Sequence, residues 1–141
     1  MENYIKLEFP SRSNNEAFAR MAAAAFASRL DPTVEELGDI KTAVSEAVTN
    51  CIVHAYPDKI GKISMKMRIL DGDIVEIKIR DWGKGIEDIK QAMTPLFTTG
   101  GEDRSGMGFT IMESFTDKLK IKSKPGKGTS VTMLKGISTK I

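Results

Sequence analysis

Glu46 and Asn50 are two polar residues whose types and spacing suit chemistry on a phosphate group. They are four positions apart in a segment with helical periodicity, so they lie one turn apart on the same side of a helix. A carboxylate in that position can act as a base, and an amide oxygen can bind Mg²⁺. Taken alone, such a pair is more typical of a solvated helix face. The pair therefore needs support from other parts of the chain.

A turn with two glycines follows a predicted strand at residues 81–85. Asp81 can accept a hydrogen bond from an exocyclic amine, and Gly83 and Gly85 allow a backbone to come close to a ligand. A turn that needs positive φ angles explains the same glycines equally well. This turn on its own leaves both interpretations open.

The segment 104–109 passes from a polar, glycine-rich loop into a predicted helix. Backbone amides at the start of a helix can hold phosphate oxygens, and Arg104 would add positive charge there. A second turn, Gly128-Thr129, joins two predicted strands, where the Thr129 hydroxyl can reach a nucleotide base directly or through water. A surface loop before an ordinary helix and a simple hairpin turn are the alternatives. The chain has no P-loop, and Gly106-Met107-Gly108 lacks the third glycine of a dinucleotide-binding motif.

The elements that position these residues follow from hydrophobic periodicity. Apolar side chains alternate at 5–9, 63–67, 75–79, 119–121 and 131–134, which predicts strands arranged largely as hairpins. Helical spacing predicts helices from 14 or 15 to 29, from an N-cap at Asp31 with Pro32 in the first turn to about 54, and over 109–115. This order predicts an α+β fold of two layers, with helices on one face of a mixed, mostly antiparallel sheet.

Composition limits the classes of function. The 141 residues, with 40% hydrophobic and 28% charged side chains, predict one soluble domain over residues 1–141. A net charge of +2 disfavours nucleic acid as a partner. A single cysteine, Cys51, and a single histidine, His54, exclude an internal disulfide and a zinc constellation, and Cys51 is expected to be an inert core thiol. The start of the chain has no signal-peptide pattern and no apolar run is long enough to span a bilayer, so a cytoplasmic location without membrane contact is expected.

The order of the four motifs is more specific than any one of them. Glu46xxxAsn50, Asp81xGly83xGly85, Gly106xGly108 and Gly128-Thr129 resemble the N, G1, G2 and G3 boxes of the GHKL ATPase superfamily. The resemblance covers roughly residues 31–134. Within that superfamily, the short chain and the segment 95–99 resemble the anti-sigma-factor serine kinases.

The resemblance implies a Bergerat-type site for ATP and Mg²⁺, with a lid over about 93–109. It implies that Asp81 binds the adenine amino group, that Asn50 is the Mg²⁺ ligand and that Glu46 is the general base. Arg104 is a candidate for stabilising the transferred phosphoryl group. The remaining residues assigned to the nucleotide are Gly83, Gly85, Thr98, Ser105, Gly106, Met107, Gly108, Phe109 and Thr129.

The resemblance also implies a homodimer and two protein partners. One is a sporulation sigma factor, sigma F, which would be held inactive. The other is an anti-anti-sigma protein, which would be phosphorylated on serine. The alanine-rich side of the first helix, which includes Arg20, is a candidate contact surface because a flat apolar patch with one arginine suits an interface. The alternatives are an ATP hydrolase, an isolated histidine-kinase catalytic domain, and a nucleotide-gated binding module without kinase activity.

Overall fold

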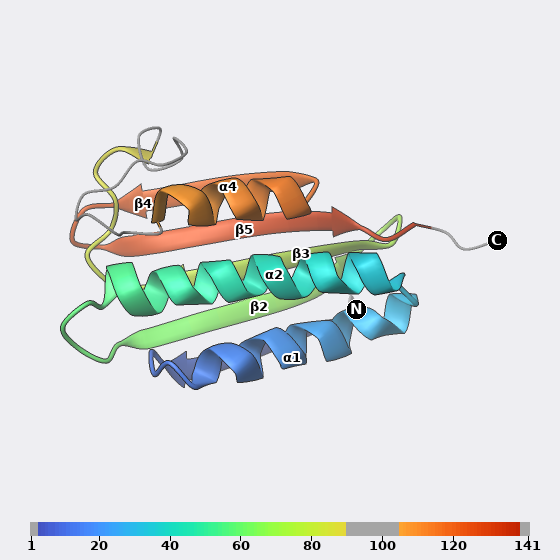
Figure 1. The fold of residues 1–141 in the computed structure, drawn as a ribbon, viewed down its shortest axis with the longest axis horizontal. Helices are drawn as coiled ribbons and strands as arrows, with labels where there is room; N and C mark the ends of the chain where they lie inside the picture. Colours follow the sequence, from blue (N-terminus) through green and yellow to red (C-terminus); the bar gives the residue numbers. More distant parts are fainter. Residues whose placement is uncertain (1–2, 90–104, 139–141) are drawn as a thin grey trace.

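Five antiparallel strands form one sheet in the computed structural model, which describes residues 3–89 and 105–138 (Figure 1). The strand order is β1-β2-β3-β5-β4, and all four neighbouring pairs are antiparallel, so the described sheet has no parallel pair. The strands are β1 (Tyr4–Pro10), β2 (Lys62–Leu70), β3 (Ile74–Asp81), β4 (Lys118–Lys124) and β5 (Gly128–Gly136).

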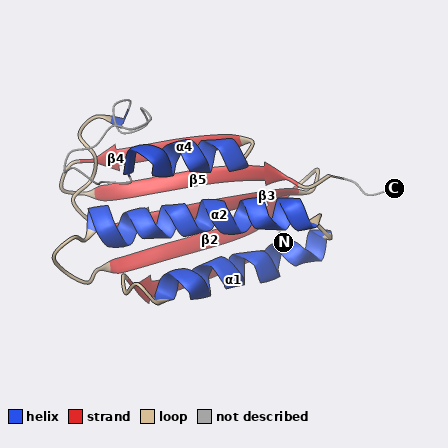
Figure 2. Ribbon diagram, in the orientation of Figure 1, coloured by secondary structure: helices blue, strands red, loops and turns tan. Residues whose placement is uncertain are grey.

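The helices lie on one face of this sheet (Figure 2). The central helix α2 (Val34–Asn50) lies between α1 (Asn15–Ala27) and α4 (Ser105–Phe115). A short 3₁₀ turn, Ser28–Leu30, follows α1, and a π-helical turn, Cys51–Ala55, continues α2. The predicted two-layer α+β fold is confirmed. No helix among the described residues combines the length and apolar character that a membrane span requires.

The core lies between the two layers. The inward residues of the strands alternate with exposed ones, as a half-buried sheet requires. The fully buried larger side chains come from α2, α4 and three of the strands, β2, β3 and β5: Ile40, Val44, Val48, Ile63, Met65, Met67, Val75, Ile77, Ile79, Met112 and Met133. Burial of these side chains fixes the register of the strands, because a shift by one residue would turn each of them to the opposite face.

The alanine-rich side of α1 is buried, so its prediction as a contact surface is wrong. Ala19, Ala23 and Ala27 have no exposed area, whereas Phe18 and Met21 are 59% and 57% exposed. Both sides of this helix are apolar, so periodicity alone does not decide which one faces the core. Small side chains let α1 pack closely onto the sheet layer and α2, and this geometry selects the alanines.

The cap of α2 also differs from the prediction. Asp31 has φ of 53° at the end of the 3₁₀ turn, and Thr33 is the N-cap. The Thr33 hydroxyl accepts from the Glu36 amide at 3.0 Å, and Glu36 Oε1 accepts from the Thr33 amide at 2.8 Å. Glu36 Oε2 also accepts from the Ser138 amide at 2.8 Å, which fastens the chain after β5 to the start of α2. These backbone donors lower the pKa of Glu36 to about 2.

Replacing Glu36 by Ala is expected to lower the free energy of unfolding by about 1 kcal/mol at pH 7, because two backbone amides lose their acceptor. The lowered pKa means that this contribution is present in full above the unfolded pKa of about 4.3 and is lost as the pH falls through about 2. Urea unfolding at pH 7 and pH 2 measures it. Glu35→Ala, in the same helical turn but exposed, is the control. An equal loss for both variants would contradict the role of the cap.

Candidate functional site

Asp81, the last residue of β3, is the buried centre of the candidate site. Asp81 is 4% exposed, and three segments of the chain converge on its carboxylate. Oδ1 accepts from the amides of Gly83 at 2.9 Å and Thr129 at 3.2 Å. The Cys51 thiol lies 3.5 Å from Oδ2 and donates to it. The predicted turn at 81–85 and the predicted turn at Thr129 therefore meet at one acceptor.

Burial dominates the electrostatics of this pair. It raises the pKa of Asp81, although the amides of Gly83 and Thr129 and the Cys51 thiol act in the opposite direction. Burial, the Asp81 charge and their hydrogen bond raise the pKa of the Cys51 thiol well above its usual value. Cys51 is a buried free thiol, as expected, but it also contacts Asp81, which periodicity did not indicate. Backbone amides hold the buried carboxylate of Asp81 in one orientation and leave some of its lone pairs unused. Such an acceptor is suited to bind an amine in a fixed orientation.

The π-helical turn Cys51–Ala55 shapes the space beside Asp81. π-helical turns inside helices are frequent at functional sites. The Ala55 carbonyl accepts from the Lys84 amide at 3.3 Å, and a Cβ added to Gly83 would overlap this carbonyl. Gly83 is therefore required so that the turn after β3 can lie directly against the end of α2.

Tyr56 is a residue of the site that sequence reasoning missed. Its hydroxyl donates to the Lys62 carbonyl at 2.7 Å and accepts from the Trp82 amide at 2.7 Å. It thus fixes the turn that carries Asp81 to the start of β2. The sequence signal for this role is weak: Gly61 lies five residues after Tyr56, and a Cβ at Gly61 would overlap the tyrosine ring.

Two further glycines allow the backbones around Asp81 to approach each other. Gly85 has φ of 76°, and a Cβ there would overlap the Lys124 carbonyl. Gly128 has φ of 111°, and a Cβ there would overlap the Asp81 carbonyl. The structure thus confirms the need for positive φ at both glycines and adds close packing against the protein's own backbone, whereas the approach of a ligand to this turn stays a prediction.

Gly128→Ala is expected to destabilise the protein by about 3 kcal/mol or more, because the new methyl group meets backbone atoms in a left-handed conformation. Gly126→Ala is the matched control: Gly126 also has positive φ, of 76°, but a Cβ there meets nothing within 4 Å. Thermal unfolding of both variants separates the effect of positive φ, which both share, from the steric overlap that only Gly128→Ala introduces. A Gly128→Ala loss no larger than that of Gly126→Ala would contradict the close packing of this turn on Asp81.

Thr129 brings a hydroxyl to the same region. Its Oγ1 lies 2.7 Å from the Ser123 hydroxyl, which also accepts from the Ile86 amide at 2.8 Å. Ser123 was not singled out from the sequence because a lone serine in an alternating strand carries no distinctive pattern. The two hydroxyls tie β4, β5 and the segment after Gly85 together beside Asp81.

Glu46 and Asn50 are half-buried on α2, one turn apart, as predicted. Asn50 Nδ2 is buried and has no hydrogen-bond partner among the described residues. A Cβ added to Gly108, in the first turns of α4, would lie 3.1 Å from Asn50 Oδ1. An unsatisfied buried amide group normally indicates a missing ligand, ion or water. Because the two ends of an amide can exchange by rotation, this position can offer an oxygen to a cation.

Part of the predicted site falls outside the described residues. Thr98, Arg104 and most of the predicted lid, 93–109, belong to the segment 90–104. Ser105, Gly106 and Met107 begin α4, so their backbone lies at its N-terminus, but their side chains are not described. Gly108 and Phe109 are buried in the same helix. Arg20 lies on α1, away from these residues, and pairs with Glu16 at 3.2 Å.

This fold and site define a class of nucleotide-binding proteins. Residues 9–135 match the family model of the histidine kinase-like ATPase domain. The structure resembles the RsbU and RsbW domains of a Mycobacterium tuberculosis protein with a TM-score of 0.73 and 16% identity, covering 98% of this chain and 33% of that one. It also resembles a mycobacterial sensor histidine kinase, MprB, with a TM-score of 0.58 and 13% identity, covering 92% and 96%. These structures support the fold alone.

Sequence relatives narrow the class. The chain is 60% identical to an anti-sigma F factor of Caldanaerobacter subterraneus subsp. tengcongensis, covering 96% of this chain and 94% of the relative. It is 57% identical to one from Thermoanaerobacter sp., covering 97% and 96%, and 55% identical to one from Clostridium botulinum, covering 95% and 94%. The chain therefore belongs to the anti-sigma F factor family of histidine kinase-like ATPases, and the resemblance inferred from the four motifs is confirmed.

Proposed function

We propose that this protein is an anti-sigma factor and a serine protein kinase. It binds and inhibits a sporulation sigma factor, sigma F, and uses Mg-ATP to phosphorylate a serine of an anti-anti-sigma protein. The observation that carries the proposal is the identity of 55–60% to anti-sigma F factors over nearly the whole chain. The buried Asp81 site on the expected fold adds a physical basis for nucleotide binding.

The adenine base is assigned to the Asp81 side of the site. The carboxylate is held by Gly83 and Thr129 amides, and its remaining lone pairs can accept from the adenine amino group. The Thr129 hydroxyl, on the residue whose amide donates to Asp81, is proposed to contact the same base. The phosphates then extend toward Asn50 and the N-terminus of α4, where free backbone amides favour anions.

The residues fit a magnesium ion that shares its coordination with phosphate oxygens. No group of three or more acidic, histidine or cysteine side chains could hold a metal within the described part of the chain. Mg²⁺ commonly uses only one or two protein ligands beside substrate phosphates. Asn50, with its unsatisfied buried amide, is the proposed ligand. When bound, the ion neutralises charge on the phosphates.

Glu46 is the proposed general base. It would take the proton of the substrate serine hydroxyl, while the serine oxygen forms a bond to the γ-phosphorus and the bond to ADP breaks. Glu46 lies one helical turn before Asn50, on the same side of α2, and this supports the proposed role. Arg104 is proposed to stabilise charge on the transferred group.

Partner binding is proposed for the exposed side of α1. Arg20 is half-exposed on that helix, and Phe18 and Met21 nearby leave large apolar areas uncovered. An arginine beside exposed apolar side chains suits a protein contact better than the buried alanines do. A homodimer and a cytoplasmic location are part of the same proposal.

The test follows labelled phosphate. The purified protein is incubated with γ-labelled Mg-ATP and lysate from its source. Transfer to a small protein as acid-stable phosphoserine is expected, together with capture of a sigma factor. Label released only as free phosphate would instead indicate a hydrolase, and acid-labile phosphohistidine would indicate a histidine kinase. Label remaining on ATP while partners still bind would indicate a nucleotide-gated binding module.

A further inference from the structure

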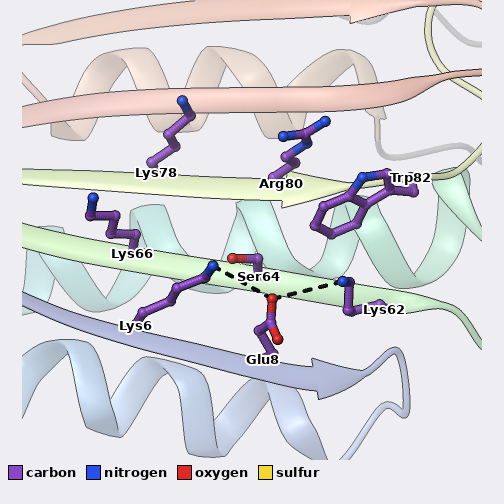
Figure 3. A pocket seen from close by; sticks show the side chains of 8 residues that line it. All are labelled: Lys6, Glu8, Lys62, Ser64, Lys66, Lys78, Arg80 and Trp82. Carbon is purple, nitrogen blue, oxygen red and sulfur yellow. Dashed lines mark ion pairs between the residues drawn. The ribbon is translucent and has the colours of Figure 1, made fainter.

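The face of the sheet opposite the helices is covered with basic side chains. Strand alternation and the observed register place one set of residues on this open face, away from the core. Figure 3 shows its shallow hollow between β1, β2 and β3. The described strands bring ten basic residues to this face, and two acidic ones: Lys6, Lys62, Lys66, Arg68, Lys78, Arg80, Lys118, Lys120, Lys122 and Lys124, with Glu8 and Glu76.

The fold therefore separates charges that nearly cancel in the sequence. The whole chain has 21 basic and 19 acidic residues, for a net charge of +2. Ten basic and two acidic residues give the open face about +8, and the remaining 11 basic and 17 acidic residues give the rest of the chain about −6. The expectation that nucleic acid is not a partner rested on the net charge, which does not report this asymmetry.

Like charges face each other directly across neighbouring strands. Lys6 is opposite Lys66, and Lys66 is opposite Lys78. The same row continues across β5, where Thr132 lies opposite both Lys78 of β3 and Lys120 of β4. Such pairs of like charge destabilise a sheet. Glu8 contacts Lys6 at 3.7 Å and Lys62 at 3.8 Å, but it offsets only part of the positive charge. An anionic partner would remove this repulsion.

Two exposed aromatic rings, those of Trp82 and Tyr4, lie among these cations. Trp82 is 38% exposed, with Lys62 Nζ 4.4 Å and Arg80 Cζ 4.7 Å from its ring centroid. Figure 3 shows these three side chains at one end of the hollow. Tyr4 is 50% exposed, and Lys66 Nζ lies 5.5 Å from its ring. Basic surfaces combined with exposed aromatic rings bind single strands, because phosphates contact the cations and bases stack on the rings.

We propose that the open sheet face binds single-stranded nucleic acid. Five strands spaced about 4.8 Å apart give a basic surface roughly 19 Å wide, enough for several nucleotides. The basic residues form two groups, one on β1, β2 and β3 and one on β4, with the uncharged open-face residues of β5 between them. A chain of phosphates can contact both groups, and the exposed Trp82 and Tyr4 offer stacking that an acidic peptide would not use. A second copy meeting this face with its own would oppose about +8 with +8. The inference goes beyond the proposed kinase function, and the two sites lie on opposite faces of the sheet.

The test measures binding of fluorescently labelled oligo(dT) and oligo(U), about 20 nucleotides long, to the full chain. Saturating Mg-ADP is present so that the oligonucleotide cannot occupy the nucleotide site. A Kd of about 100 μM or tighter is expected at low salt, and the logarithm of affinity should fall with the logarithm of salt with a slope of about −2 or steeper, which corresponds to three or more neutralised phosphates. Fluorescence of Trp82, the single tryptophan, should be quenched on binding.

Charge reversal locates the surface. Lys66→Glu with Lys78→Glu is expected to weaken binding by tenfold or more and to reduce the salt slope by about 0.7 for each phosphate that is no longer neutralised. Arg12→Glu with Lys59→Glu makes the same change in net charge at exposed residues outside the face and should alter affinity less than about twofold. Unchanged Mg-ADP binding in both double variants verifies that they fold.

Three results would overturn the proposal. The first is the absence of oligonucleotide binding at low salt, or an equal loss of affinity in both double variants. The second is binding of polyglutamate as tightly as the oligonucleotide, which would make the face a dock for an acidic protein. The third is a change in sedimentation of the Lys66→Glu, Lys78→Glu protein without oligonucleotide, which would make the face an interface between copies. Each leaves the labelled-phosphate test of the kinase unaffected.

Discussion

Replacement of Glu46 by Gln is expected to slow phosphoryl transfer to serine by about 10²- to 10⁴-fold, the usual effect of removing a general base. Glutamine keeps the size and helical position of the side chain but cannot take up the serine proton. The affinity for Mg-ATP should change less than about threefold, because the proposed adenine contact at Asp81 and the proposed phosphate contact at the N-terminus of α4 both remain. Single-turnover transfer to the isolated substrate protein, with equilibrium nucleotide binding measured separately, distinguishes the two effects.

Glu35→Gln provides a matched control on the same helix. Glu35 is exposed in the first turn of α2, far along the helix from Asn50, and its variant should transfer phosphate at the parental rate. Sigma-factor binding should persist in both variants. If the Glu46→Gln protein transferred phosphate at the parental rate, Glu46 would not be the general base. A parallel loss of nucleotide affinity would assign Glu46 to binding instead.

The strands and helices were predictable because their signals are local. Alternation of apolar residues located each of the described strands. The turn between β2 and β3, Asp71-Gly72-Asp73, has positive φ at Gly72 and Asp73, which is typical of a tight hairpin. The apolar stripe of α2 is buried as expected. The N-cap of α2 was misplaced because Asp31-Pro32 and Thr33-x-x-Glu36 both carry start signals, and only the capping box forms.

The buried face of α1 depends on tertiary packing and was therefore predicted wrongly. Phe18 and Met21 are more hydrophobic than alanine, which favoured the stripe that the structure exposes. In the structure, four alanines and Phe26 are the buried residues of α1. Arg20 is half-exposed on α1, and its assignment as a partner contact stays a prediction. The exposed apolar side chains on this helix are Phe18 and Met21 rather than the alanines first expected.

The candidate site was predictable where residue type and order carried the signal. Asp81, Gly83 and Thr129 were singled out from the sequence, and the structure joins them through hydrogen bonds. The π-helical turn and the Tyr56 bridge were not predictable, because they arise from backbone groups and from a hydroxyl 26 residues away from its partner at Trp82. The basic sheet face was not predicted for a related reason. The register of the strands decides which charged side chains share a face, and the net charge of the chain carries no information on register.

Asp81→Asn is expected to separate nucleotide binding from stability. The amide oxygen of asparagine can still accept from the Gly83 and Thr129 amides, so the turn retains its hydrogen bonds. The amide nitrogen, however, replaces the acceptor proposed for the adenine amino group and presents a donor to a donor. ATP affinity should fall by about 100-fold, as loss of a hydrogen bond to a charged group and an unpaired buried donor require. Isothermal titration with Mg-ATP measures this loss.

The stability of the same variant should move in the opposite direction. Burial raises the pKa of Asp81, so the folded protein holds this proton more tightly than the unfolded chain does. The parental protein therefore loses stability as the pH rises from the unfolded pKa of about 3.9 through the raised native value. The asparagine variant has no such loss, and at pH 7 it should equal or exceed the parent by up to about 1 kcal/mol.

Asp81→Ala is the control that removes the acceptor altogether. It leaves the Gly83 and Thr129 amides unpaired and should cost about 2 kcal/mol or more in urea unfolding. If Asp81→Asn is destabilised as strongly as Asp81→Ala, the charge of the carboxylate stabilises the fold. It would then not be a destabilising feature that is kept for ligand binding. If it binds ATP normally, adenine is recognised elsewhere. The opposed shifts in affinity and stability are the expected signature of a buried carboxylate retained for its ligand, because a neutral amide would serve the fold at least as well.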